Sequence, residues 1–159
     1  MSEVRVVTIP ESEKSELLAE LQPYLQELMQ YGTFRPVDGE FKYKWLDVHW
    51  QEEGRWPFWA MANGSKAGFA LVRRDDEGLM HMSEFYIRPT YRRAGLGLSF
   101  AHAILRRFPG TWIISEYRSN GAAVAFWRKV ASPFPFSERE YVGDEGVPRL
   151  EQKVLVARA

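Results

Sequence analysis

The most informative segment of this chain is Ile87-Arg88-Pro89-Thr90-Tyr91-Arg92-Arg93-Ala94-Gly95-Leu96-Gly97. A strand-like run from about residue 79 to 87 leads into it, and residues 95–108 behind it carry small and apolar side chains on one helical face. The stretch is therefore a strand-to-helix turn. Its two glycines let the backbone approach a ligand without a Cβ in the way. The free N–H groups of the first helical turn and the positive end of the helix dipole then predict an anion site suited to a pyrophosphate.

The segments around this turn alternate between strand and helix patterns. Asn63-Gly64 lies between two apolar runs and is a strong hairpin signal, and a second turn at 75–78 leads into the strand before the junction. We therefore expect an antiparallel meander of three strands there, and loops with one or two helical turns over 32–56. The expected strands are 4–9, 58–62, 67–72, 79–87, 111–115 and 149–157, and the expected helices are 11–29, 95–108 and 120–130. This order predicts a mixed α/β fold.

Length and composition limit the class of protein. The 159 residues suit one domain, predicted to span 1–159, and 45% apolar with 26% charged residues is typical of a globular chain. No apolar run approaches a membrane span, and the N-terminus lacks a signal-peptide layout, so we expect a cytoplasmic protein without a membrane partner. The absence of Cys excludes disulfides, a thiolate nucleophile and Cys-ligated zinc, and we predict no metal site.

The net charge of zero, from 21 basic and 21 acidic residues, hides an uneven distribution. Between Arg88 and Lys129 there are eight basic residues and one acid, Glu116, so this segment carries +7 and the remainder carries −7. A local excess of positive charge indicates that this segment meets an anion.

In this turn and in the segment 120–129, the chain resembles a known family, the GNAT superfamily of N-acetyltransferases. The turn is similar to the segment that binds the acetyl-CoA pyrophosphate, Gln/Arg-x-x-Gly-x-Gly/Ala after a strand and Val-x-Pro-x-Tyr-Arg, with Pro89 and Tyr91 in register. Residues 120–129 are similar to the family pattern Asn-x-x-Ala-x-x-Phe/Leu-Tyr-x-Lys. The resemblance is specific over about residues 58–130. It implies a central, mostly antiparallel, twisted sheet of about six or seven strands, flanked by about four helices, with a splayed parallel strand pair at the cofactor site.

The resemblance also implies acetyl-CoA as the co-substrate and assigns residues to it. The main chain of Phe85 and Ile87 would pair with the pantetheine amides, as an added strand does. Asn120 would hydrogen-bond the pantetheine arm, although after Ser119 it is equally a good helix N-cap. Phe126 and Trp127 would lie beside the arm. The pyrophosphate would be held, chiefly by backbone N–H groups, at Arg92, Arg93, Ala94, Gly95 and Gly97.

Acetyl transfer needs a base for the amine and a proton for the leaving thiolate. The family often supplies the proton from a Tyr seven residues after the Asn, but this chain has Trp127 there, and an indole is not an acid near neutral pH. Tyr86, Tyr117 or Tyr141 could replace it, and water could serve as donor. For the base we rank two glutamates near the ends of the strands that splay around the cofactor, followed by a histidine. These are Glu84, Glu116 and His81.

The amine site is expected in residues 32–59, which hold eight of the 23 aromatic residues together with several acids. Aromatic faces and carboxylates bind an ammonium group. Most of these aromatics can equally fill a core under long loops. Tyr43 and Asp47 are our candidates for substrate contact.

The sequence thus predicts an N-acetyltransferase that moves the acetyl group of acetyl-CoA to a primary amine, on a small molecule or a peptide, in a ternary complex. One alternative is a catalytically weak acyl-CoA-binding sensor, which Trp127 favours. A nucleic-acid-binding module using the +7 segment ranks lower, because the aromatics cluster elsewhere. An edge strand and an aromatic-rich surface are compatible with a homodimer.

Overall fold

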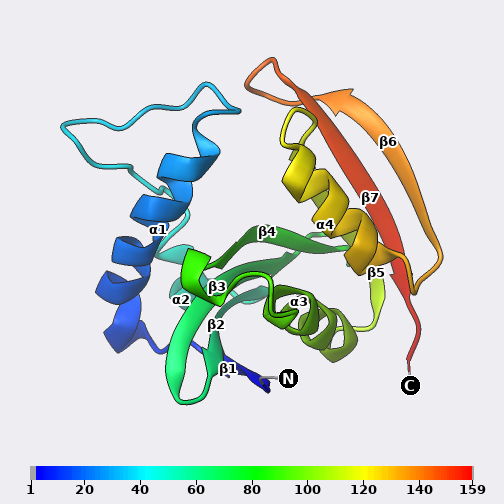
Figure 1. The fold of residues 1–159 in the computed structure, drawn as a ribbon, viewed down its shortest axis with the longest axis horizontal. Helices are drawn as coiled ribbons and strands as arrows, with labels where there is room; N and C mark the ends of the chain where they lie inside the picture. Colours follow the sequence, from blue (N-terminus) through cyan, green and yellow to red (C-terminus); the bar gives the residue numbers. More distant parts are fainter. Residues whose placement is uncertain (1–2, 159) are drawn as a thin grey trace.

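A twisted sheet of seven strands forms the centre of the protein (Figure 1). The structure is a computed structural model and describes residues 3–158. The strand order is β1-β2-β3-β4-β5-β7-β6, and within it the pair β4–β5 is parallel while the other pairs are antiparallel. The strands are β1 (Val4–Thr8), β2 (Arg55–Ala62), β3 (Ser65–Arg74), β4 (Met80–Ile87), β5 (Gly110–Tyr117), β6 (Phe136–Val142) and β7 (Pro148–Val156).

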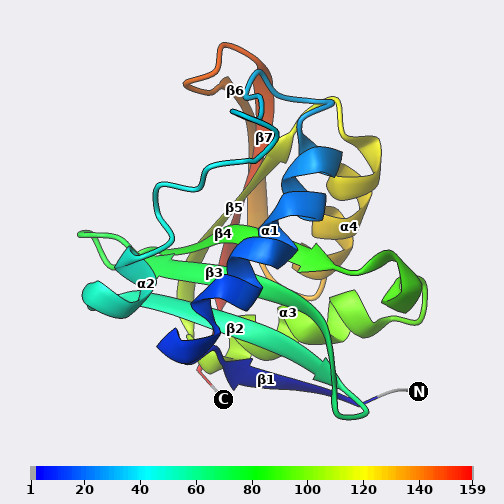
Figure 2. The same cartoon turned by 90° about the vertical axis from the view of Figure 1, so that its left-hand side faces the viewer.

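Helices cover both faces of this sheet. The described residues hold α1 (Lys14–Leu28), α2 (Val48–Gln51), α3 (Leu96–Arg107) and α4 (Gly121–Ala131), with short 3-10 turns at Glu11–Glu13 and Pro89–Tyr91. Figure 2 shows α1 lying across one face, and α3 and α4 lie on the other. The predicted mixed α/β fold, with a mostly antiparallel sheet and one parallel pair, is confirmed. None of the helices in residues 3–158 is long and apolar enough to cross a membrane.

One strand, β6, is absent from the expectations above. Its residues FSEREYV are nearly all exposed, so they show no apolar alternation of the kind that marks a half-buried strand. The strand exists because its backbone pairs with β7 from Phe136↔Val154 to Val142↔Pro148 at the edge of the sheet. The turn between β6 and β7 contacts the loop after α1 through Glu145 and Thr33.

Two apolar clusters hold the helices on the sheet. On the α1 face, Leu17, Leu21 and Leu25 recur every four residues and pack with Phe69 and Leu71 of β3. Each fully buried Leu contributes roughly 2 kcal/mol of hydrophobic free energy. On the opposite face, α3 and α4 pack against the other side of the same strands. The position of α1 relative to β4 is therefore fixed by ordinary core packing.

A β-bulge in β4 decides which side chains face which helix. The register with β3 shifts between Leu71↔Glu84 and Val72↔Met82, so Ser83 is an extra residue. Met80 and Met82 face the α3/α4 cluster, and simple alternation would put Glu84 there too. The bulge instead turns Glu84 and Tyr86 toward α1. Phe85, which lies between them, faces the α3/α4 side.

The parallel strands β4 and β5 separate soon after they begin. Their pairing consists of Met80↔Trp112 and His81↔Ile113, and the rest of each strand diverges from the other. The later part of β4 therefore has a backbone edge that β5 does not occupy. Because a strand edge left unpaired can accept an extended ligand, this splay is where a binding site is expected.

Candidate functional site

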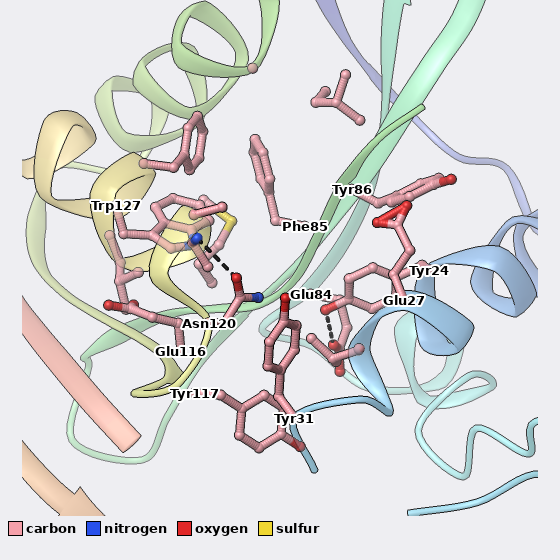
Figure 3. Close-up of a pocket in the computed structure, with 18 of the residues that line it drawn as sticks. Tyr24, Glu27, Tyr31, Glu84, Phe85, Tyr86, Glu116, Tyr117, Asn120 and Trp127 are labelled. Atoms are coloured by element: carbon pink, nitrogen blue, oxygen red, sulfur yellow. Dashed lines mark hydrogen bonds between the residues drawn. The ribbon is translucent and has the colours of Figure 1, made fainter. Parts of the chain in front are cut away.

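A cavity of about 980 Å³ opens between the diverging strands (Figure 3). Its walls come from α1, β4, the turn before α3, β5 and α4. A cleft of this size is at the upper end of those that hold cofactor-sized ligands. Its two ends differ in chemistry, with a basic turn and helix N-terminus at one and carboxylates with tyrosines at the other.

The turn before α3 forms the anion-binding end. Gly95, the residue before the helix, has φ 76°, a left-handed conformation that favours glycine, and Arg93 has φ 71°. The first N–H groups of α3 have no partner within the helix and point out of its positive end. Of the five residues predicted here, four line the cavity, namely Arg92, Arg93, Gly95 and Gly97, whereas Ala94 lies between them without lining it.

Two arginines of this region are already paired with α1. The Arg92 Nη2 atom lies 2.9 and 3.0 Å from the two carboxylate oxygens of Glu27, and its Nε donates to the Ile87 carbonyl at 2.7 Å. Arg88 makes a similar two-pronged contact with Glu20, at 2.9 and 2.7 Å. The positive charge that the sequence gathers here is therefore partly neutralised by one edge of α1.

Asn120 uses its two side-chain atoms for two purposes. Its Oδ1 accepts a hydrogen bond from the backbone N–H of Ala123 at 3.2 Å and so caps α4. Its amide nitrogen points into the cavity in Figure 3. The cap and the ligand contact weighed from the sequence are therefore compatible.

An aromatic wall lies beside Asn120 on the α3/α4 side. The centroid of the Phe85 ring is 4.9 Å from that of Trp127 and 5.5 Å from that of Phe126. The Phe126 and Trp127 ring centroids are 4.8 Å apart. Trp127 is 8% exposed, so it serves as a wall of the cavity packed into the core. Ile87 lines the cavity close by, next to Gly97, where an added Cβ would lie 3.4 Å from the Ile87 side chain.

On the α1 side, Glu84 is held by two tyrosines. Its Oε1 accepts from the Tyr24 hydroxyl at 2.7 Å, and its Oε2 accepts from the Tyr43 hydroxyl at 3.0 Å. Burial raises the pKa of Glu84, and the two hydrogen bonds partly offset that rise. Tyr43 reaches the site through this carboxylate and does not itself line the cavity. Glu84 is thus a positioned carboxylate whose proton affinity is above that of an ordinary one.

Glu116 lines the same cavity as Glu84 but faces the opposite side of the sheet. It is 5% exposed, its Oε2 accepts from Gln152 at 2.7 Å, and its Oε1 has no hydrogen-bond partner among residues 3–158. Figure 3 shows its carboxylate turned away from Glu84. Burial raises the pKa of Glu116 to about 7, and the nearby Glu138 adds to the rise. The two glutamates ranked together from the sequence therefore have different surroundings.

The raised pKa of Glu116 predicts a pH-dependent stability. Because its pKa rises from 4.5 in the unfolded chain to about 7 in the folded protein, the folded state binds the proton more tightly. This stabilisation is complete below pH 4.5 and is lost as the pH rises through about 7, by about 3 kcal/mol in the free energy of unfolding. Glu116→Gln should remove this dependence of stability on pH. Urea unfolding at pH 5 and pH 8 measures it. If the free energy of unfolding changes equally between the two pH values in wild type and variant, the assignment to Glu116 is wrong.

The other predicted residues lie away from the centre of the cavity. Tyr86 lines the cavity, and the centre of its ring is 5.7 Å from that of Tyr24. Its hydroxyl, however, points away from Glu84 in Figure 3. The structure does not bring Asp47 to the cavity, because this exposed carboxylate pairs with Lys14 at 2.9 Å. His81 pairs with Asp75 at 2.8 Å, and Tyr141 contacts the cavity residue Ser115 at 2.7 Å, but neither His81 nor Tyr141 lines the cavity. Among residues 3–158, no three carboxylate or histidine side chains form a metal-binding group.

Sequence reasoning missed that α1 and the turn after it line the cavity, most notably through Tyr24, Glu27 and Tyr31. A signal for these three residues does exist. Glu27 and Tyr31 follow Tyr24 by three and seven residues, so the three form one helical stripe beside the buried leucines. A stripe of tyrosine and glutamate side chains next to a stripe of leucines indicates a helix that packs on the core with one face and lines a binding site with the other.

Comparison with known proteins places this architecture among the acetyltransferases. The model of the acetyltransferase (GNAT) family matches residues 18–131, and the chain belongs to this family. A search of curated proteins finds no significant match.

Solved structures with the same fold include enzymes that act on different amines. They include a ribosomal-protein-S18-alanine N-acetyltransferase from Escherichia coli (TM-score 0.63, 18% identity, covering 99% of this chain and 96% of that chain). They also include an aminoglycoside acetyltransferase in complex with coenzyme A and kanamycin (TM-score 0.72, 15% identity, 96% and 95%). A third is a ribosomal-protein-alanine N-acetyltransferase from Brucella melitensis (TM-score 0.69, 18% identity, 96% and 99%).

Proposed function

We propose that this protein transfers the acetyl group of acetyl-CoA to a primary amine by direct attack within a ternary complex. One observation carries the proposal: a single cavity joins the helix N-terminus behind Gly95 to the carboxylate of Glu84 across the splay of β4 and β5. A long ligand with an anionic end and a reactive end fits such a cavity. An amine can then approach that reactive end from the α1 side.

The residues present suit coenzyme A as co-substrate. The N–H groups at the start of α3, with Arg93 beside them, would receive the pyrophosphate. The unpaired edge of β4 at Phe85 and Ile87 would pair with the pantetheine amides. The free amide nitrogen of Asn120 and the aromatic wall would complete the contact with the arm.

The chemistry then assigns different tasks to the two sides of the sheet. The amine nitrogen attacks the thioester carbon, its proton passes to Glu84, and the C–S bond breaks to release the thiolate. Glu84 suits this task because it faces the α1 side, is held by Tyr24 and Tyr43, and has a raised pKa. Glu116 also lines the cavity but turns its carboxylate away from Glu84, so we assign the role of base to Glu84.

The acceptor end favours a cationic amine. Glu84 lines the cavity on the α1 side together with the rings of Tyr24, Tyr31 and Tyr117, whereas the nearby Glu27 is already paired with Arg92. Carboxylates with aromatic faces stabilise an ammonium group before it loses its proton. Both a polyamine-like small molecule and a peptide N-terminus have this chemistry, and the solved relatives include enzymes named for each kind of substrate.

The test is the release of free thiol from acetyl-CoA, measured with a panel of polyamines, aminoglycosides and peptides with N-terminal alanine. Mass spectrometry of the product should show one added acetyl group on a primary amine. Tight acetyl-CoA binding without turnover on any acceptor would favour the second candidate, an acyl-CoA-binding sensor. The observation in favour of that candidate is Trp127, a core-packed indole in place of a proton donor.

A further inference from the structure

Four tyrosines line the cavity, and their hydroxyls are in different situations. Those of Tyr24 and Tyr117 donate to the carboxylates of Glu84 and Glu145. That of Tyr86 points away from the splay in Figure 3. The Tyr31 hydroxyl has no hydrogen-bond partner within residues 3–158 and points into the cavity, where Glu84 stands on one side of it and Asn120 on the other in this view.

Tyr31 is held in place by contacts that span most of the chain. Glu145, in the turn between β6 and β7, accepts a hydrogen bond from the backbone N–H of Thr33 at 2.7 Å and from its hydroxyl at 3.2 Å. The same carboxylate accepts from the Tyr117 hydroxyl. The Tyr117 ring lies 6.5 Å from the Tyr31 ring. We call Thr33, Tyr117 and Glu145 the clasp, because they join the loop after α1 to the far edge of the sheet (Figure 1).

Gly32 makes the clasp possible. A Cβ at this position would lie 2.7 Å from Oε1 of Glu145 and would collide with the Tyr117 hydroxyl. The backbone directly after Tyr31 is therefore pressed against the clasp. Tyr31 lies in the turn just after α1, where its N–H donates to the Leu28 carbonyl at 3.1 Å. Its backbone is thus held on both sides, by α1 before it and by the clasp after it.

We propose that Tyr31 is the proton donor to the coenzyme A thiolate, the role that Trp127 cannot fill. The inference rests on the proposed function. When the C–S bond breaks, sulfur keeps the electron pair and takes the Tyr31 hydroxyl proton, which gives the free thiol. The phenolate regains a proton from solvent, and Glu84 returns the amine's proton to solvent, so the protons balance. A phenol keeps its proton at neutral pH and is a better donor than water at a fixed position.

The test compares Tyr31→Phe with Tyr141→Phe, because Tyr141 does not itself line the cavity and its hydroxyl contacts the side chain of Ser115. In Tyr31→Phe, kcat should fall about tenfold while the Kd for acetyl-CoA stays within about twofold. This loss is smaller than the 10²-fold or more typical of proton transfer, because a thiol of pKa about 8.5 is a fair leaving group. Tyr141→Phe should match the wild type.

A second readout separates a donor from a structural role and does not depend on turnover. The pKa of the bound coenzyme A thiol, titrated by thiolate absorbance, should rise by about one unit in Tyr31→Phe, because the thiolate loses a charge-assisted hydrogen bond. Glu145→Gln should shift it less, in the same direction. A higher amine KM with unchanged kcat and thiol pKa would overturn the proposal and make Tyr31 an acceptor contact. A wild type that binds coenzyme A but acetylates nothing would refute the proposed function. The thiol titration would still show whether the Tyr31 hydroxyl contacts the coenzyme A sulfur.

Discussion

Replacing Glu84 by Gln should lower kcat for amine acetylation by about 10²- to 10³-fold and leave the Kd for acetyl-CoA within about twofold. The carboxylate accepts from Tyr24 and Tyr43 and faces the α1 side, from which we propose that the amine approaches. A glutamine has one carbonyl oxygen for two tyrosine donors and no base for the amine proton. Steady-state thiol release and acetyl-CoA titration measure both quantities.

The matched control is Glu116→Gln, the same change on the other face of the splay. Because Glu116 contacts Gln152 and turns away from Glu84, kcat at saturating substrates should change less than about threefold. The pH profile gives a further check. Burial raises the pKa of Glu84, so the acidic limb of kcat should lie above the usual carboxyl range and disappear in Glu84→Gln. Equal losses in both variants would show that Glu84 is not the base.

The anion-binding turn could be predicted from sequence because everything needed for it is local. A strand, two glycines and a helix start within eleven residues, and the left-handed Gly95 follows from that spacing. The opposite directions of Glu84 and Glu116 could not be predicted in the same way. The direction of Glu84 depends on a bulge at Ser83, whose trace in the sequence is that the apolar residues Met82 and Phe85 are three positions apart. Glu116 instead follows the simple alternation of β5 and shares a face with Trp112 and Ile114.

The clasp was beyond sequence reasoning for a different reason. Thr33 and Glu145 are 112 residues apart, and Glu145 belongs to a hairpin whose first strand shows no apolar pattern. No local signal links such residues, since only the closed sheet brings them together. The proton donor proposed here depends on this contact, so the sequence could indicate the missing acid at Trp127 but not its replacement.

The uneven charge distribution has a more specific meaning in the folded protein. Glu20 and Glu27 lie seven residues apart on α1 and neutralise Arg88 and Arg92. The basic segment is therefore not a continuous positive surface of the kind that tracks a nucleic-acid backbone. What remains of this segment's charge at the cavity is Arg93 in the turn and Lys129 on α4, which suits a ligand with one compact anionic group.

Gly95→Glu should weaken acetyl-CoA binding by at least about 100-fold. The side chain places a carboxylate at the N-terminus of α3, where the pyrophosphate is expected, and the two anions repel each other and compete for the same N–H groups. A carboxylate is itself favourable at a helix N-terminus, so α3 should stay folded. Calorimetric titration with acetyl-CoA measures the loss, and circular dichroism monitors the fold.

Gly95→Ala separates charge from backbone strain. At φ 76° any residue with a Cβ costs roughly 1–2 kcal/mol, and both variants carry this cost. Alanine should therefore lower the affinity at most by about tenfold, and the further loss in Gly95→Glu reports the charge alone. An added Cβ at Gly95 meets no atom within 4 Å, so packing does not confuse the comparison. If the two variants bind acetyl-CoA equally well, the pyrophosphate does not lie at this turn, and the orientation of the co-substrate proposed here is wrong.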